Sequence, residues 1–377
     1  MDMKKIVVAS DSFKGSLSST QVADSVERGI RMVYPMCDVI KVDVADGGEG
    51  TVDAVVGALG GEKVVAVVQD PLGRDIEAVY GVAGDLAVME MAAASGLPLL
   101  SQDERNPWKT STYGTGQMIK YAMDRGCRRF MIGIGGSATN DAGMGMARAL
   151  GFKFYDKDGK EIKDGVGGRL KDVAVIDDSG VDSRVGECTF TVACDVDTPF
   201  CGESGAAYVF APQKGADEDM VKRLDAGMYN YAAVIKEKYG IDIVPMSGAG
   251  AAGGLGGGFK ALLGARLKKG VDMVLDAICF DELLCGADLL ITGEGKVDFQ
   301  TPRGKTASGV LSRGKKAGVK VVALGGKVEM CDELLEMGFE GIYPITEEVL
   351  PLEVAMRYDV ASGNVTRTIV EKVLVGE

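Results

Sequence analysis

The chain has 377 residues, of which 46% are hydrophobic and 26% charged, values typical of a globular protein of about two to three domains. Its 55 acidic and 42 basic residues give a net charge of −13, which argues against general affinity for nucleic acids or anionic membranes. The sequence contains no histidine, so histidine triads and imidazole relays are excluded.

The first 60 residues alternate strand and helix patterns. Residues 5–10 are apolar and rich in valine, and residues 18–33 have helical periodicity after a serine at the start. Residues 40–44 and 51–59 repeat the same order of strand and helix. This alternation predicts a parallel sheet.

Three strands then follow at residues 63–69, 76–82 and 86–91. Turn residues such as Asp70 and Pro71 separate them, and the connections are too short for helical crossovers. These strands are therefore predicted to be antiparallel.

From residue 287 the alternation of strand and helix resumes. Strands are predicted at 288–292, 320–324 and 341–344, and helices at 307–317, 332–337 and 364–374. The simplest architecture is one doubly wound domain formed by residues 1–60 and 287–377, with a mixed α/β domain inserted at 61–286. The active site is expected in the cleft between these two domains.

The eight cysteines show no Cys-x-x-Cys spacing, and we interpret them as reduced, mostly buried thiols. The apolar run near the start is too short for a signal peptide, and no segment has about 18 uninterrupted apolar residues. We expect a soluble, cytoplasmic protein, either a monomer or a homodimer, with no membrane or nucleic-acid partner.

Residues 131–145 form the most informative segment, an apolar strand that runs into glycines and polar residues. Gly135 and Gly136 carry no Cβ that would block a phosphate or carboxylate. Ser137 and Thr139 are predicted to cap a helix that begins near residue 141. The polar residues of this segment that are expected to line a phosphate or acceptor site are Ser137, Asn140 and Asp141.

Polar residues also follow the first two strands. Lys14 comes shortly after the first strand and either offers its ammonium to an anion or is a solvated loop lysine. Asp46 and Glu49 follow the second strand, and their carboxylates can hold a hydrated Mg²⁺ against phosphates. The alternative is an ordinary Asp-Gly turn in which Thr51 is the N-cap of the next helix.

Asp195 ends another apolar run, residues 190–193. A carboxylate at this place can accept a proton from a substrate hydroxyl, a task that falls to a carboxylate, lysine or tyrosine in a chain without histidine. A structural aspartate at a strand end is the alternative.

The segment 247–258 consists almost entirely of glycine and alanine. Gly248, Gly250 and Gly253 match the Gly-x-Gly-x-x-Gly fingerprint of dinucleotide sites, and Gly254 extends the run. Successive backbone amides can cradle a nucleotide, although no βαβ pattern surrounds the motif. A flexible linker is the alternative.

A further polar cluster follows the strand at 288–292. Glu294 and Asp298 are candidate Mg²⁺ ligands, and Lys305 is a candidate phosphate-binding residue. The Gly-Lys-Thr at 304–306 is not a Walker A motif, because Phe299 stands where the leading glycine would be.

Five clusters of glycine, carboxylate and lysine at strand ends indicate an anionic, metal-chelated ligand such as a nucleotide. Two alternative functions are compatible with the same residues. One is a nicotinamide-dinucleotide-dependent oxidoreductase built on the glycine run, and the other is a nucleotide sensor without catalytic activity.

In these motifs the chain resembles the class I glycerate kinase family. The matching segments span nearly the whole chain in order and lie at 11–15, 46–51, 133–141, 194–196, 213–216, 248–256 and 291–295. One departure is Ala142, which stands where the family usually has a second glycine.

The resemblance implies a flavodoxin-like domain joined to a second α/β domain. It also implies ATP- and Mg²⁺-dependent phosphorylation of D-glycerate, for this class at the 2-hydroxyl, with the 3-hydroxyl or a related hydroxy acid as alternatives. On this hypothesis Asp195 orients or deprotonates the glycerate hydroxyl, and Lys14 neutralises charge on the substrate carboxylate or the transferred phosphoryl group.

Overall fold

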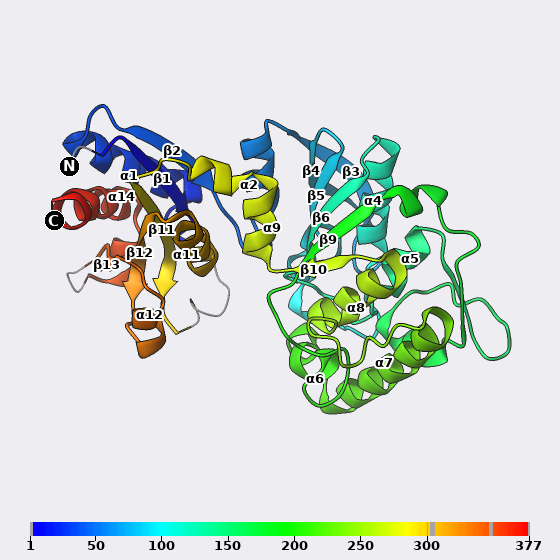
Figure 1. The fold of residues 1–377 in the computed structure, drawn as a ribbon. Helices are drawn as coiled ribbons and strands as arrows, with labels where there is room; N and C mark the ends of the chain where they lie inside the picture. Colours follow the sequence, from blue (N-terminus) through cyan, green and yellow to red (C-terminus); the bar gives the residue numbers. More distant parts are fainter. Residues whose placement is uncertain (1–2, 300, 302–305, 347–349, 376–377) are drawn as a thin grey trace. The chain divides into compact units, whose positions relative to one another are not determined.

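The computed structural model describes residues 3–299, 301, 306–346 and 350–375. The chain forms two compact units, each with its own sheet (Figure 1). The first unit contains Met1–Asp46, Gly57–Leu59 and Val271–Glu377, and the second contains Gly47–Val56 and Gly60–Gly270. Both chain ends therefore lie in one unit.

The sheet of the first unit has five parallel strands in the order β2-β1-β11-β12-β13. The strands are β1 (Lys5–Ser10), β2 (Asp38–Asp43), β11 (Leu289–Val297), β12 (Lys320–Val328) and β13 (Gly341–Pro344). This is the flavodoxin-like order, and the strand order reverses between β1 and β11. The doubly wound, flavodoxin-like fold predicted for the chain ends is confirmed.

Helices cover both faces of this sheet. They are α1 (Ser19–Val33), α9 (Gly270–Ala277), α10 (Phe280–Leu283), α11 (Thr306–Ala317), α12 (Asp332–Glu336), α13 (Leu352–Ala355) and α14 (Tyr358–Thr368), which continues as a π-helix over Ile369–Leu374. On one face α1 packs against α14, where the hydroxyls of Ser25 and Ser362 are 2.8 Å apart. On the other face Gly314 of α11 lies against Val321 and Leu290. Burial on both faces explains the continuous apolar runs of β1 and of the first halves of β11 and β12.

Residues 271–286 lie in the first unit, although the sequence places them in the inserted domain. Val271 of α9 packs against Gly309 of α11. Arg313 of α11 also forms ion pairs with Asp276 and Asp281, at 2.5 and 3.0 Å. These contacts, made with residues that follow much later in the chain, are not visible in the local sequence pattern.

The second unit has a six-stranded mixed sheet in the order β10-β9-β6-β5-β4-β3. Its strands are β3 (Glu62–Gln69), β4 (Asp75–Ala83), β5 (Leu86–Glu90), β6 (Arg129–Gly133), β9 (Thr189–Ala193) and β10 (Arg266–Lys268). The strands β3, β4 and β5 are antiparallel, as predicted, whereas β5, β6, β9 and β10 are parallel. A separate hairpin is formed by β7 (Lys153–Tyr155) and β8 (Val175–Asp177).

The helices of the second unit surround an apolar core. They are α2 (Thr51–Leu59), α3 (Ala92–Ser95), α4 (Tyr113–Asp124), α5 (Met144–Ala149), α6 (Ala206–Phe210), α7 (Glu218–Tyr239) and α8 (Ala251–Leu263), with short 3-10 turns at Leu97–Leu99, Gln102–Glu104, Gly167–Asp172, Ser183–Glu187 and Pro212–Lys214. Within the core the rings of Phe130 and Phe190 stack with their centroids 4.9 Å apart, which joins β6 to β9.

All eight cysteines have free thiols. Only Cys37, Cys127 and Cys201 are buried, so the expectation that most of the thiols are buried is wrong. Among the described residues, every helix is too short or too polar to cross a lipid bilayer.

Candidate active site

Three parallel strands of the second unit end at the same edge of its sheet. Gly133 at the end of β6 pairs with Glu90 of β5 on one side and with Ala193 of β9 on the other. The loops that follow β6 and β9 therefore emerge next to each other. Open α/β sheets bind ligands at this carboxyl edge.

The loop after β6 reaches the surface over only a few residues. Gly135 and Gly136 are exposed and Ser137 is 7% exposed, whereas Asn140 and Asp141 are completely buried. A Cβ added at Gly135 would make only an ordinary van der Waals contact, 3.8 Å from the Gly48 Cα, so this backbone is not crowded. The part of this loop that is open to a ligand thus consists of Gly135 and Gly136, with the largely buried Ser137 directly after them.

Asp141 organises the loop from inside. One carboxylate oxygen accepts hydrogen bonds from the Thr112 amide (2.8 Å), the Thr112 hydroxyl (2.7 Å) and the Gly145 amide (3.1 Å). The other oxygen accepts from the Gly143 amide at 3.2 Å. Burial raises the pKa of Asp141, and these four donors oppose the rise. This geometry suits a residue that fixes the loop rather than one that contacts a ligand.

Asn140 and Thr139 lie beneath the same loop. The Asn140 amide nitrogen donates to the sulfur of Met228 at 3.3 Å. The Asn140 side-chain oxygen and the Thr139 hydroxyl are buried and have no hydrogen-bond partner within the described part of the chain. The structure does not bring Asn140 to the surface at which Ser137 lies.

The predicted helix cap in this segment is wrong. Helix α5 begins at Met144, later than expected, and its N-cap is Gly143 with φ +77°. Asp141 accepts the amides of Gly143 and Gly145, so the buried carboxylate satisfies donors that Ser137 and Thr139 were expected to take. Ala142 adopts a left-handed φ of +53°, a conformation in which glycine is not strained.

The loop after β9 carries two exposed carboxylates. Asp195 accepts a hydrogen bond from the Gly270 amide at 3.0 Å, and Asp197 accepts one from the Ser247 hydroxyl at 2.8 Å. Ala193 is in register with Gly133. Asp195 therefore lies two residues beyond the end of β9, and Gly135 lies two residues beyond the end of β6. The structure therefore brings together two parts of the predicted site, Asp195 and the loop of Ser137.

The loop that contains Glu49 packs on this same edge. A Cβ added at Gly133 would lie 2.1 Å from the Gly47 carbonyl oxygen, and one added at Gly47 would lie 2.4 Å from the Ala193 Cβ. Glycine is required at both positions because the backbones approach so closely. Glu49 is exposed two residues beyond this contact.

The alternative interpretation of this loop, in which Thr51 is the N-cap of α2, is wrong. The N-cap is Gly50 with φ +91°, and the Thr51 hydroxyl donates to the Gly48 carbonyl at 2.7 Å. Instead the carboxylate of Glu90 accepts a hydrogen bond from the Val52 amide at 3.1 Å. Burial raises the pKa of Glu90, while its bonds to the backbone lower it.

The glycine run forms the start of a buried helix. Helix α8 includes residues 251–258, with left-handed conformations at Gly253 and Gly254. A Cβ added at Gly253 would lie 2.1 Å from the Thr139 carbonyl oxygen, and one at Gly250 would lie 2.1 Å from the Pro199 carbonyl oxygen. Gly248, Gly250, Gly253 and Gly254 are all buried. The glycines permit close packing of backbone on backbone, so the linker and the exposed nucleotide cradle do not describe this segment.

The first unit has its own polar edge at the point where the strand order reverses. The Asp11 amide after β1 donates to the Gly293 carbonyl of β11 at 3.0 Å, which joins the two strand ends. Lys14 is exposed and lines a pocket of about 150 Å³ together with Lys327 from β12. Because Lys327 is paired with Glu329 at 2.6 Å, Lys14 is the lysine of this pocket that suits an anionic group.

Carboxylates gather at this edge as well. Burial raises the pKa of Asp11, and the nearby carboxylate of Asp46 raises it further. Glu294 and Asp298 are almost fully buried, and both bond to Thr301, whose hydroxyl donates to Glu294 at 2.5 Å and accepts from the Asp298 amide at 3.2 Å.

No group of three or more cysteine, aspartate and glutamate side chains in the described ranges could hold a metal ion by itself. Mg²⁺ is usually held by one or two carboxylates with water and substrate phosphates, so Asp46 beside Asp11 fits its requirements. Asp298 also forms an ion pair with Lys296 at 2.9 Å, which makes it a weaker candidate. Lys305 lies outside the described residues.

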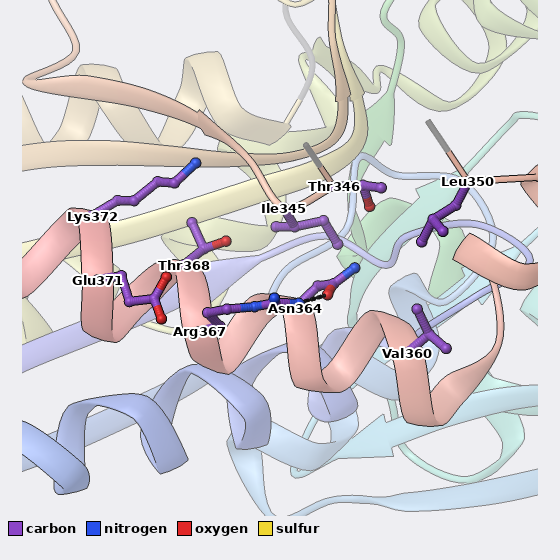
Figure 2. Close-up of a pocket in the computed structure, with 9 residues that line it drawn as sticks. All are labelled: Ile345, Thr346, Leu350, Val360, Asn364, Arg367, Thr368, Glu371 and Lys372. Carbon is purple, nitrogen blue, oxygen red and sulfur yellow. Dashed lines mark hydrogen bonds between the residues drawn. The ribbon is translucent and has the colours of Figure 1, made fainter. Parts of the chain in front are cut away.

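A second hollow of the first unit, of about 280 Å³, lies between the end of β13 and helix α14 (Figure 2). Arg367 donates to Asn364 on its floor, and Glu371 and Lys372 of the π-helix line one end. None of the predicted site residues that the structure describes lines it. We give it no part in the reaction.

Three residues at these edges were not among the predicted site residues: Asp11, Glu90 and Lys214. Asp11 and Glu90 stand at the ends of apolar strands, the same signal that identified Asp195. Lys214 lies in the segment 213–216 that resembles the family, but nothing in its neighbours predicts its burial. Its ammonium donates to the Ser137 hydroxyl and to the Thr139 carbonyl, both at 2.7 Å.

Comparisons with known proteins agree with this architecture. The model of the Glycerate kinase family matches residues 6–374. The chain is 46% identical over 358 residues to the glycerate kinase of Halalkalibacterium halodurans, covering 94% of each protein. It is 42% identical over 373 residues to the glycerate 2-kinase of Escherichia coli K12, covering 97% of this chain and 98% of that protein.

A solved structure matches along the full fold. It is a crystal structure from Salmonella typhimurium LT2, described as a glycerate kinase 2, with a TM-score of 0.88 and 42% identity over 98% of this chain and 96% of that one. These matches exclude the oxidoreductase interpretation, whose fingerprint glycines are buried just before and within the first turn of α8. The chain belongs to the glycerate kinase family and is a phosphotransferase.

Proposed function

We propose that the protein transfers the γ-phosphoryl group of ATP to the 2-hydroxyl of D-glycerate, giving 2-phospho-D-glycerate and ADP. The observation that carries the proposal is the edge of the second unit, where Asp195 stands beside the loop of Gly135 and Ser137. Hydrogen-bond donors next to an exposed carboxylate suit a small hydroxy acid, because it presents an anionic group and a hydroxyl together. The name of the Escherichia coli relative supports the 2-position.

In the second unit Asp195 accepts the proton of the glycerate hydroxyl as the hydroxyl oxygen bonds to the γ-phosphorus. The bond between the γ-phosphorus and the β–γ bridging oxygen breaks, and that oxygen leaves with ADP. The carboxylate need not be a strong base, because phosphoryl transfer depends mainly on positioning and charge stabilisation. The hydrogen bond from the Gly270 amide holds Asp195 in place.

The loop after β6 binds an anionic oxygen of the substrate. The exposed backbone of Gly135 and Gly136 allows close approach, and the Ser137 hydroxyl supplies a donor. Asp141 and Asn140 support this loop from beneath, each through contacts that are completely buried.

In the first unit Lys14 neutralises charge on a phosphoryl or carboxylate group at the pocket that it lines with Lys327. Asp46 and Asp11 would hold Mg²⁺ at the same strand edge of this unit, and Glu294 is the next candidate. When bound, Mg²⁺ neutralises the negative charge of the ATP phosphates. In the second unit the exposed Glu49 is a separate candidate for a Mg²⁺ ligand.

A coupled assay of ADP release tests this proposal. With ATP and Mg²⁺ present, D-glycerate should stimulate ADP release strongly, whereas glycerol, which lacks the carboxylate, should not. Equal stimulation by both compounds, or none by D-glycerate, would contradict the proposed substrate.

A further inference from the structure

Lys214 is a buried lysine directly beneath the loop after β6. It ends the 3-10 turn Pro212–Lys214 and is only 1% exposed. Its ammonium donates to the Ser137 hydroxyl and to the Thr139 carbonyl, both at 2.7 Å. Lysine is almost never fully buried unless its charge is paired, so this arrangement needs an explanation.

The charge of Lys214 has no direct carboxylate partner in these two bonds. The nearest acidic influence is that of Asp141, which is itself completely buried and occupied by four other donors. Burial lowers the pKa of Lys214 to about 7, and Asp141 opposes that shift. Such a costly burial is not explained by stability, since an apolar side chain of similar length would fill the same space without desolvating a charge.

The bond to Ser137 decides how the serine hydroxyl can be used. A hydroxyl has one donor and two acceptor positions. Because Lys214 occupies an acceptor position, the proton of Ser137 stays available for another acceptor. Ser137 directly follows the exposed Gly135 and Gly136 and is itself 7% exposed.

The carbonyl of Thr139 receives the second bond from Lys214 and also lies against Gly253 of α8. Lys214 thus forms hydrogen bonds to the residues on both sides of Ala138. The Ala138 carbonyl itself accepts a hydrogen bond from the Thr110 hydroxyl at 2.8 Å. The loop is fixed from two directions, and among the hydrogen bonds of the described residues to 137–139 the one positive charge comes from Lys214. That charge is 2.7 Å from the Ser137 hydroxyl, which directly follows the exposed Gly136.

We propose that Lys214 is a positioning residue of the kinase reaction, which holds the Ser137 hydroxyl so that its proton is donated to an anionic oxygen of the substrate. The inference rests on the proposed function of this site. It adds a residue that touches no substrate and acts through Ser137. Its charge strengthens the same hydrogen bond, because a donor polarised by a cation binds an anion more tightly.

A double-mutant cycle tests the coupling between the two residues. Lys214→Met and Ser137→Ala should each lower kcat/KM for D-glycerate by roughly 10- to 100-fold, the effect of one charge-assisted hydrogen bond. The kcat/KM of the double variant should be no lower than that of Lys214→Met alone, because both changes remove the same interaction. Losses that multiply, or a Lys214→Met variant with wild-type kcat/KM, would overturn the inference.

Two variants separate positioning from simple structural support. Lys238→Met removes a lysine of α7 that donates to the Ile176 carbonyl at 2.8 Å and to Asp178. Thr110→Val removes the neutral bond to the same loop. Both should lower the melting temperature and keep kcat/KM within about twofold. If Thr110→Val lost activity as Lys214→Met does, the role of Lys214 would be only structural.

If Lys214→Met does not fold, Lys214→Gln replaces it in the test. Its amide keeps a donor for Ser137 without the charge, so kcat/KM should fall less than in Ser137→Ala. A larger fall than in Ser137→Ala would count against the inference. Wild-type protein that releases no ADP with D-glycerate would overturn the proposed function itself, whereas an active wild type with multiplicative losses would overturn only the role of Lys214.

Discussion

Gly133 and Ala193 are paired in register on the adjacent parallel strands β6 and β9. This pairing places the exposed Gly135 and the exposed Asp195 equally far beyond their strand ends. Neither residue is close to the other in sequence, so the sheet creates the combination of anion donors and a carboxylate.

Asp195→Asn should reduce kcat by about 10²- to 10⁴-fold, the range expected when a proton acceptor is lost. The amide cannot take the hydroxyl proton, although it can still accept the hydrogen bond from Gly270. Steady-state ADP release, with circular dichroism to verify folding, measures the effect.

Asp197→Asn is the matched control, because Asp197 is exposed in the same loop and bonds to Ser247. Its kcat should stay close to that of the wild type. If both variants behaved alike, the assigned role of Asp195 would be wrong.

Gly253→Ala should destabilise the protein by about 2–4 kcal/mol. The new Cβ would meet the Thr139 carbonyl oxygen at 2.1 Å, and φ is +69°, so overpacking adds to backbone strain. Gly264→Ala has a similar φ of +65° but open space around it, and should cost only about 1 kcal/mol. Urea unfolding of both variants makes the comparison. Equal costs would show that the glycine run is not required for packing.

The buried Lys214 predicts a particular dependence of stability on pH. Its folded pKa of about 7 lies below its usual value of 10.5, so between these values the unfolded chain binds more protons than the folded one. The free energy of unfolding of the wild type should therefore gain up to about 1.4 kcal/mol per pH unit in this window, relative to Lys214→Met. Urea unfolding at several pH values gives this difference. A constant difference would mean that Lys214 keeps its usual pKa.

Removal of Mg²⁺ with EDTA should abolish ADP release, and added Mg²⁺ should restore it. Asp46→Asn should raise the Mg²⁺ concentration needed for half-maximal rate by roughly tenfold, because one of few charged oxygen ligands is lost. Asp43→Asn is the control, since Asp43 bonds to Thr20 near the same strand end. An unchanged requirement in Asp46→Asn would remove Asp46 from the proposed ligands.

The fold was predictable where local patterns and strand order agree. Alternating apolar strands and amphipathic helices identified β1, α1 and α2, and the short turns identified the antiparallel strands β3 to β5. Helix α8 was missed because glycine is a poor helix former, and its glycines are required by contacts with residues 139–142 and 199–200 that follow only from the tertiary structure.

The sequence was sufficient to predict which strand ends carry the candidate site. It was not sufficient to predict the role of each residue there. The sequence shows Ser137, Asn140 and Asp141 as similar polar residues. Only the structure separates Ser137, which is 7% exposed beside two exposed glycines, from a completely buried carboxylate that accepts four hydrogen bonds. Lys214 could not be predicted at all, since burial of a lysine depends on partners about 75 residues earlier in the chain.

Identification of the product formed from D-glycerate and ATP by ³¹P nuclear magnetic resonance tests the proposed reaction directly. ADP and 2-phospho-D-glycerate should accumulate in equal amounts. Formation of 3-phosphoglycerate would contradict transfer to the 2-hydroxyl, and the absence of any phosphorylated glycerate would contradict the proposed kinase activity.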